Sequence, residues 1–102
     1  MLHKEEKQRQ AVEMLCTDML VPRDHLLRKI DAAVDFDLIY EFVEDLYCPD
    51  NGRPSIDPAV LFKMVLIQHL YGIRSLRQTV KDIELNVGYR WFLGYTMAQE
   101  IP

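Results

Sequence analysis

The chain has 102 residues and a formal net charge of −4 at pH 7, and 49% of its residues are hydrophobic. This composition fits one domain with an apolar core and excludes a disordered tail. The sequence also lacks an apolar run of the roughly 18 residues that a membrane span needs, and its charged start, MLHKEEKQRQ, excludes a secretory signal peptide. We therefore expect the protein to be cytoplasmic.

Charge is unevenly distributed along the chain. Residues 1–50 carry 6 Lys or Arg and 12 Asp or Glu, a net charge of −6, whereas residues 51–102 carry 6 and 4, a net charge of +2. This asymmetry predicts an acidic part and a mildly basic part. The basic part alone predicts weak, salt-sensitive DNA binding, because affinity depends on the number of phosphates neutralised.

The first third of the chain predicts a tail and one helix. Residues 1–13 are polar and predict a tail or a frayed helix, so residues 14–102 are expected to form the single folded domain. Pro22 ends any structure before it. Asp24 can cap a helix over residues 25–34.

A second helix is predicted to begin after Asp35 or Asp37 and to end near Tyr47, with Phe42 on its inner face. Its outer face is acidic. That face indicates either a solvated surface or a contact for a basic partner. The segment CPDNGRPSI, residues 48–56, then predicts a loop.

Asp57 and Pro58 together predict a helix start, because Asp can cap the helix and Pro is tolerated at its first position. The predicted helix covers residues 58–71 and is apolar nearly all round, which is typical of a buried central rod in a bundle. Gly72 is well placed to end it.

Ser75 can cap the next helix, in which Leu76, Val80 and Ile83 would point inward. Residues 86–88 interrupt this helix, and a last short helix covers residues 89–93, closed by Gly94. The predicted fold is therefore all-α, a small bundle of about five helices. Its C-terminal part, residues 75–94, resembles a helix-turn-helix.

The candidate DNA-binding residues lie in this C-terminal part. Arg74, Arg77 and Lys81 follow helical spacing, and Tyr89 and Arg90 open the last helix. An exposed basic stripe beside a compact helix pair suits DNA docking, although the same side chains could simply be solvated. Trp91 and Phe92 are adjacent, so they cannot point the same way on a helix. We expect at least one of these rings to fill the core and Arg90 to reach outward.

No catalytic or metal-binding group is predicted in this chain. His3, His25 and His69 are scattered, whereas zinc needs three or four converging ligands, and His69 is expected to be hydrogen-bonded in or near the core. Cys16 and Cys48 lack metal-ligand spacing and are expected to be free thiols. Without a nucleophile motif or a phosphate-binding glycine loop, an independent enzyme is disfavoured.

Three segments carry a family resemblance: LVPRDHLLRKID (20–31), LYCPDNGRPSIDPAVLFKMVLIQHLYGIRSLRQ (46–78) and NVGYRWFLG (86–94). Over residues 12–102 the chain resembles the N-terminal domain of bacterial insertion-sequence transposases of the DDE type. The resemblance implies a helical domain that precedes an RNase H-like catalytic domain. In such enzymes three acidic residues hold two divalent metal ions such as Mg²⁺, and the resemblance places these residues beyond Pro102.

The function that the resemblance implies is DNA binding or assembly in a transposase, by recognition of the terminal inverted repeats during transposition. Expected partners are double-stranded DNA, the catalytic domain of the same polypeptide and a second copy of the chain; no membrane partner is expected. The expected location is the cytoplasm, at the nucleoid. The alternative is a protein-interaction module that dimerises or docks the catalytic domain without contacting DNA. The resemblance assigns no DNA contact to a residue, so the basic side chains rest on charge and spacing.

Overall fold

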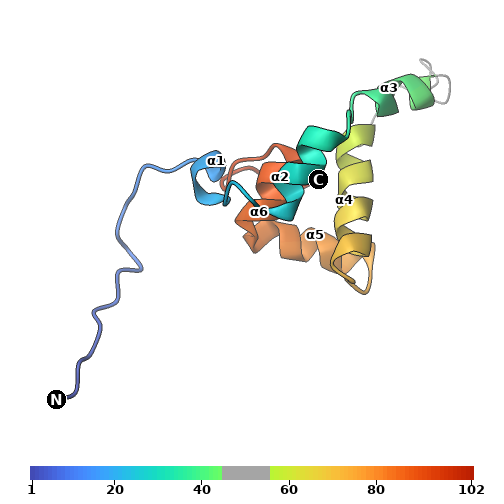
Figure 1. The fold of residues 1–102 in the computed structure, drawn as a ribbon. Coiled ribbons are helices and arrows are strands. Elements are labelled where there is room, and N and C mark those ends of the chain that lie inside the picture. Colours follow the sequence, from blue (N-terminus) through green and yellow to red (C-terminus); the bar gives the residue numbers. More distant parts are fainter. Residues whose placement is uncertain (45–55) are drawn as a thin grey trace.

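The computed structural model describes residues 1–44 and 56–102. Within these ranges the fold contains helices and no strand, which confirms the predicted all-α bundle (Figure 1). The helices are α1 (Thr17–Leu20), α2 (Leu26–Ala33), α3 (Leu38–Val43), α4 (Pro58–Leu70), α5 (Leu76–Leu85) and α6 (Val87–Leu93). The first residues of the chain extend away from the helical body.

The short helix α6 lies at the centre of the bundle and packs against α1, α2, α4 and α5. Its Phe92 is 1% exposed and its Leu93 is also buried. The Phe92 ring meets the Phe36 ring edge-on, with 5.5 Å between the ring centroids. The other buried side chains of the core come from three further helices: Leu27, Met64, Ile67 and Ile83.

The expectation that residues 58–71 form a buried central rod is wrong. Helix α4 lies along one side of the bundle and packs against α3, α5 and α6. Only Ala59, Met64 and Ile67 of this helix are buried, whereas Phe62 is 48% exposed. An apolar composition predicts burial only where neighbouring elements exist to cover the helix, and the neighbours of α4 cover one face.

The predicted starts of α4 and α5 and the predicted end of α6 are confirmed. Asp57 Oδ1 accepts the amide hydrogen of Ala59 at 2.8 Å, and Ser75 Oγ accepts that of Gln78 at 3.1 Å. Gly94 closes α6 with a φ of 92°, which is in the left-handed region that glycine tolerates best. These signals act within four residues of each helix end, so the sequence alone determines them.

The predicted cap of α2 is wrong, because His25 takes the role assigned to Asp24. Helix α2 begins at Leu26, and His25 Nδ1 accepts the amide hydrogen of Leu27 at 3.1 Å. Asp24 therefore lies one residue too early to reach the free amides of the first turn.

Helix α3 begins after Asp37, which is one of the two predicted starts. The Asp37 side chain makes no capping hydrogen bond. Phe42 of this helix is 79% exposed and not on an inner face, because α3 packs only on α4 among the described helices. The predicted end near Tyr47 and nearly all of the predicted loop lie outside the described residues.

Helix α5 departs from its predicted inner face at one position. Ile83 is buried and Val80 packs against the core, but Leu76 is 37% exposed. Thr79 is fully buried instead, and its hydroxyl donates to the carbonyl oxygen of Ser75 at 2.9 Å. A threonine can be buried here because this local bond satisfies its hydroxyl.

Asn86 links α5 directly to α6. It follows the last residue of α5, and its Oδ1 accepts the amide hydrogen of Tyr89 at 3.0 Å. Helix α6 therefore begins at Val87, two residues before the predicted start.

Tyr40 of α3 is bonded to the N-terminal cap of α4. Its hydroxyl lies 2.6 Å from Oδ2 of Asp57 and 2.7 Å from Oδ1. Donation to the carboxylate raises the pKa of Tyr40 to about 12 and lowers the pKa of Asp57. The bond is therefore strongest while the tyrosine is neutral and the carboxylate is charged.

We expect Tyr40→Phe to lower the urea midpoint of unfolding at neutral pH, with a pH dependence that identifies the bond. Asp57 has a lowered folded pKa, so its contribution is present above about pH 4 and is lost as the pH falls through that pKa. Tyr40 has a raised folded pKa, so its contribution is present below about pH 10 and is lost as the pH rises toward 12. The difference between the wild type and the variant should thus be largest between these limits. An equal difference at pH 3, 7 and 11 would contradict the assignment.

Candidate nucleic-acid interface

Three of the five predicted DNA-binding residues share one exposed surface. Arg74 precedes α5, and Arg77 and Lys81 lie one turn apart on it; all three are exposed. We call these three residues the basic ridge. The ridge faces outward because α5 turns Thr79 and Ile83 into the core, and residues 77 and 81 lie away from that direction on a helix with 3.6 residues per turn.

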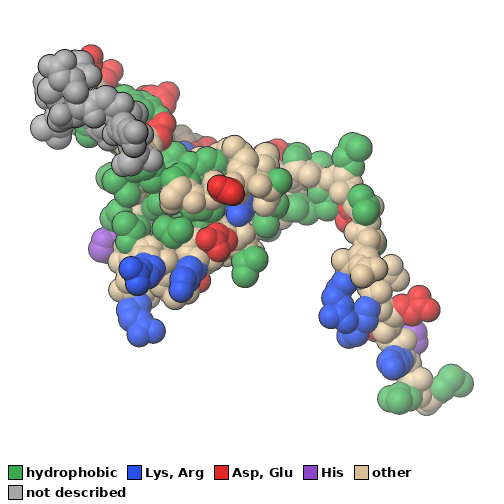
Figure 2. Space-filling model, turned by 180° about the vertical axis from the view of Figure 1, so that it is seen from behind, with side chains coloured by type: hydrophobic (Ala, Val, Ile, Leu, Met, Phe, Trp, Pro, Cys, Tyr) green, Lys and Arg blue, Asp and Glu red, His purple; other side chains and the backbone are tan. Residues whose placement is uncertain are grey.

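The basic ridge carries uncompensated charge. No ion pair and no side-chain hydrogen bond within residues 1–44 and 56–102 includes a member of the ridge. The nearby carboxylate of Asp82 accepts instead from the side-chain amide of Gln78 at 2.9 Å. Figure 2 shows Lys and Arg side chains gathered at the lower edge of the helical body, on the side where α4 and α5 meet. Three exposed cations that have no ion-pair partner among the described residues can meet phosphate groups.

Tyr89 lies beside this surface and is half-buried. Its ring is 5.2 Å from the ring of Tyr71, centroid to centroid. Burial is the main cause that raises the pKa of the Tyr89 hydroxyl, with smaller contributions from Tyr71 and Asp82. The hydroxyl is therefore neutral at physiological pH and can donate a hydrogen bond. Tyr89, Lys81, Asp82, Leu85 and Asn86 together line a shallow depression of about 280 Å³.

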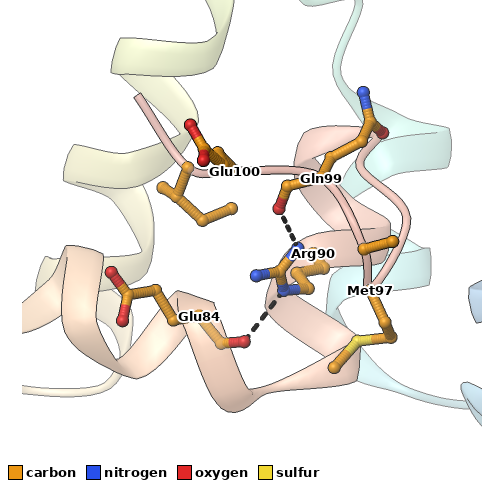
Figure 3. A pocket seen from close by; sticks show the side chains of 7 residues that line it. Glu84, Arg90, Met97, Gln99 and Glu100 are labelled. Atoms are coloured by element: carbon orange, nitrogen blue, oxygen red, sulfur yellow. Dashed lines mark hydrogen bonds between the residues drawn. The ribbon is translucent and has the colours of Figure 1, made fainter.

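The expectation that Arg90 reaches outward is wrong. Arg90 is 5% exposed, and its guanidinium group donates to three backbone carbonyl oxygens. Figure 3 draws the bonds to Glu84 and Gln99. Nε donates to Glu84 at 3.0 Å, and Nη1 donates to Thr96 at 2.6 Å and to Gln99 at 2.7 Å. Arg90 thus ties the segment after α6 to the end of α5. A cation already bonded to three acceptors inside the fold is not available to a phosphate.

Arg90 forms the floor of a shallow pocket of about 470 Å³. Glu84 and Glu100 lie on its rim (Figure 3), which gives the opening an acidic character unsuited to an anion. We therefore do not count this pocket as part of the candidate nucleic-acid surface.

The two adjacent rings of α6 separate as predicted, with Phe92 in the core. Trp91 is half-buried, and the guanidinium carbon of Arg28 lies 4.5 Å from its ring centroid. The indole Nε1 of Trp91 donates to Asp18 Oδ1 at 3.0 Å. Neither ring is free to stack on a base.

The histidines do not converge. His25 caps α2, and His69, expected in or near the core, is exposed near the end of α4. Residues 1–44 and 56–102 contain no cluster of three His, Cys, Asp or Glu side chains that could hold a metal ion. Among the same residues, no helix is long and apolar enough to span a membrane.

Comparison with known proteins places the chain in a family. The family described as "Transposase domain (DUF772)" matches residues 15–102. No curated protein and no solved structure matches the chain. The match covers the whole helical body, from before α1 to the last residue. The chain therefore belongs to the DUF772 transposase-domain family.

Proposed function

We propose that this domain binds double-stranded DNA for a transposase and recognises the terminal inverted repeats of the element. The observation that carries the proposal is the basic ridge, where Arg74, Arg77 and Lys81 are exposed and make no ion pair within the described residues. Phosphate contacts from Arg and Lys supply most of the sequence-independent affinity of DNA-binding proteins.

The proposed setting is a DDE-type transposase at the bacterial nucleoid. Strand cleavage and transfer would belong to a catalytic domain of the same polypeptide, which would hold divalent metal ions through its own carboxylates. The domain described above would supply binding and assembly but no catalytic residue. Tyr89 can add a neutral hydrogen-bond donor beside the ridge.

The first test is the salt dependence of binding to the terminal-repeat duplex. Three phosphates neutralised by the ridge predict a log–log slope of about −2.7 for the wild type. Arg77→Ala and Lys81→Ala should each weaken binding and make the slope less steep by about 1. Fluorescence anisotropy with a labelled duplex at several salt concentrations measures both quantities.

Lys29→Ala is the matched control, because Lys29 is an exposed lysine on α2 and makes no ion pair within the described residues. It should leave the slope and the affinity unchanged. Equal effects of Lys29→Ala and Lys81→Ala would mean that net charge acts without a defined interface. Unchanged binding in both ridge variants would remove the ridge from the interface.

A second candidate function is protein interaction, in dimerisation or in docking of the catalytic domain. It is favoured by the large apolar side chains exposed on α3 and α4, among them Phe42 at 79% and Phe62 at 48%. This function predicts a dimer or a complex in solution and no salt-dependent DNA affinity. Sedimentation equilibrium of the chain, beside the anisotropy experiment, separates the two functions.

A further inference from the structure

Helix α6 has little surface left for DNA. Arg90, Phe92 and Leu93 are buried, and Arg28 covers the ring of Trp91. A helix that enters a groove must expose one face along most of its length. Of the two helices in residues 75–94, only α5 does so.

The connection from α4 to α5 has the form of a helix-turn-helix corner. Tyr71 ends α4 and Ser75 caps α5, so Gly72, Ile73 and Arg74 form the turn between them. Gly72 has a φ of 62°, and the amide of Ile73 donates to the carbonyl oxygen of Gln68 at 2.9 Å. From this corner α5 runs across the foot of α4 (Figure 1). In DNA-binding proteins of this kind a turn of three or four residues, often with glycine, leads into the helix that reads the major groove.

The outer face of α5 ends in an apolar side chain. Leu85 is 88% exposed and lies one turn beyond Lys81, which itself lies one turn beyond Arg77. A single exposed leucine is ordinary on a protein surface. Leu85, however, lies in line with Arg77 and Lys81 on the outer face of α5. If these two cations bind phosphates, an apolar side chain beside them can meet the methyl group of a thymine in the major groove.

Groups that can read base edges surround Leu85. The depression beside it is lined by Lys81, Asp82, Asn86 and Tyr89. Oδ1 of Asn86 accepts the backbone amide hydrogen of Tyr89, and Asn86 is exposed. Donors and an apolar side chain therefore occur together at the C-terminal end of α5.

We propose that α4 and α5 form the helix-turn-helix, that α5 is the helix that enters the major groove, and that Leu85 there contacts a thymine methyl group. This inference rests on the proposed function and adds to it the helix and the residue that supply base recognition. It assigns phosphate positioning to the basic ridge and sequence preference to the end of α5.

The test is a selection from a pool of random-sequence DNA duplexes with the complete 102-residue chain. The wild type should enrich a motif that contains at least one fixed thymine. Leu85→Ala should keep the salt slope of the wild type but lose about tenfold of the preference at one base pair, the size of one good base contact. Because Leu85 lies outside the core, the variant should keep the helical circular dichroism and the thermal midpoint of the wild type.

Leu26→Ala is the control, since Leu26 is an exposed leucine on α2, away from the ridge. It should recover the same motif as the wild type. If Leu85→Ala also recovers that motif, or if the wild type binds duplexes with a steep salt slope but enriches no motif, the inference is overturned and DNA binding stands. If the wild type binds no duplex at all, the proposed function itself is overturned.

Discussion

Arg90→Ala is expected to lower the free energy of unfolding by about 3–5 kcal/mol, the largest effect of any substitution considered. Arg90 is 5% exposed, and its guanidinium group is bonded to the carbonyl oxygens of Glu84, Thr96 and Gln99. Truncation would remove the side-chain donor from all three carbonyl oxygens, and Thr96 would keep only a long bond from the amide of Gln99 at 3.4 Å. The segment after α6 would also lose its attachment to α5.

Urea unfolding followed by circular dichroism measures this effect, with Arg77→Ala as the matched control. Arg77 is exposed and makes no side-chain hydrogen bond within the described residues, so its loss should change stability by less than about 0.5 kcal/mol. Arg90→Lys should not restore stability, because one ammonium group cannot reproduce the fork of the guanidinium. Equal stability of the Arg90 and Arg77 alanine variants would show that the three carbonyl bonds contribute nothing.

Arg77 and Arg90 differ in burial, and the sequence alone did not predict this difference. Both arginines belong to the basic half of the chain, Arg77 to the stripe at helical spacing and Arg90 to the start of the last predicted helix, and the sequence predicts both as candidate DNA contacts. Arg90 is buried because the segment that holds Thr96 and Gln99 folds back over α6 and places two carbonyl oxygens against the guanidinium group. The helix type and the caps at Asp57 and Ser75 could be predicted, since each depends on residues close in sequence.

Lys63 is a second cation of the basic half whose side chain lies against the core. Its side chain donates to the carbonyl oxygen of Phe92 at 2.9 Å and lies over the rings of Phe36 and Phe92, 4.7 and 5.1 Å from their centroids. Oδ1 of Asp31 lies 3.8 Å from Nζ of Lys63. Of the 6 Lys or Arg in residues 51–102, Lys63 and Arg90 therefore serve the interior. Among the described residues of this half, the exposed cations are Arg74, Arg77 and Lys81 of the basic ridge.

Arg28→Ala is the second substitution with a large expected effect, since Arg28 holds α1 against the bundle. Helix α1 has four residues and none of them is buried. Arg28 binds the carboxylate of Asp18 at 3.0 Å and the carbonyl oxygens of Asp18 and Val21 at 2.6 and 2.9 Å, and it stacks on Trp91. Sequence patterns could not reveal this arrangement, because Asp18 and Trp91 are 73 residues apart. Its loss should cost about 2–3 kcal/mol, in the range of hydrogen bonds to charged groups.

The expected change is local, so hydrogen exchange is the measurement that identifies it. Amides of residues 17–21 should exchange much faster in Arg28→Ala. Amides of α4 and α5 should change little, because among the described helices α1 packs on α6 and not on α4 or α5. The bonds from Arg28 and then Trp91 lower the pKa of Asp18, so this docking should be present above about pH 4 and lost as the pH falls further. Arg23→Ala is the control, since Arg23 meets the same carboxylate at 3.9 Å with a side chain that is 82% exposed. If both variants exchange alike at α1, the contacts that Arg28 alone makes, with the Trp91 ring and with the backbone carbonyl oxygens, do not hold the helix, and the assignment is overturned.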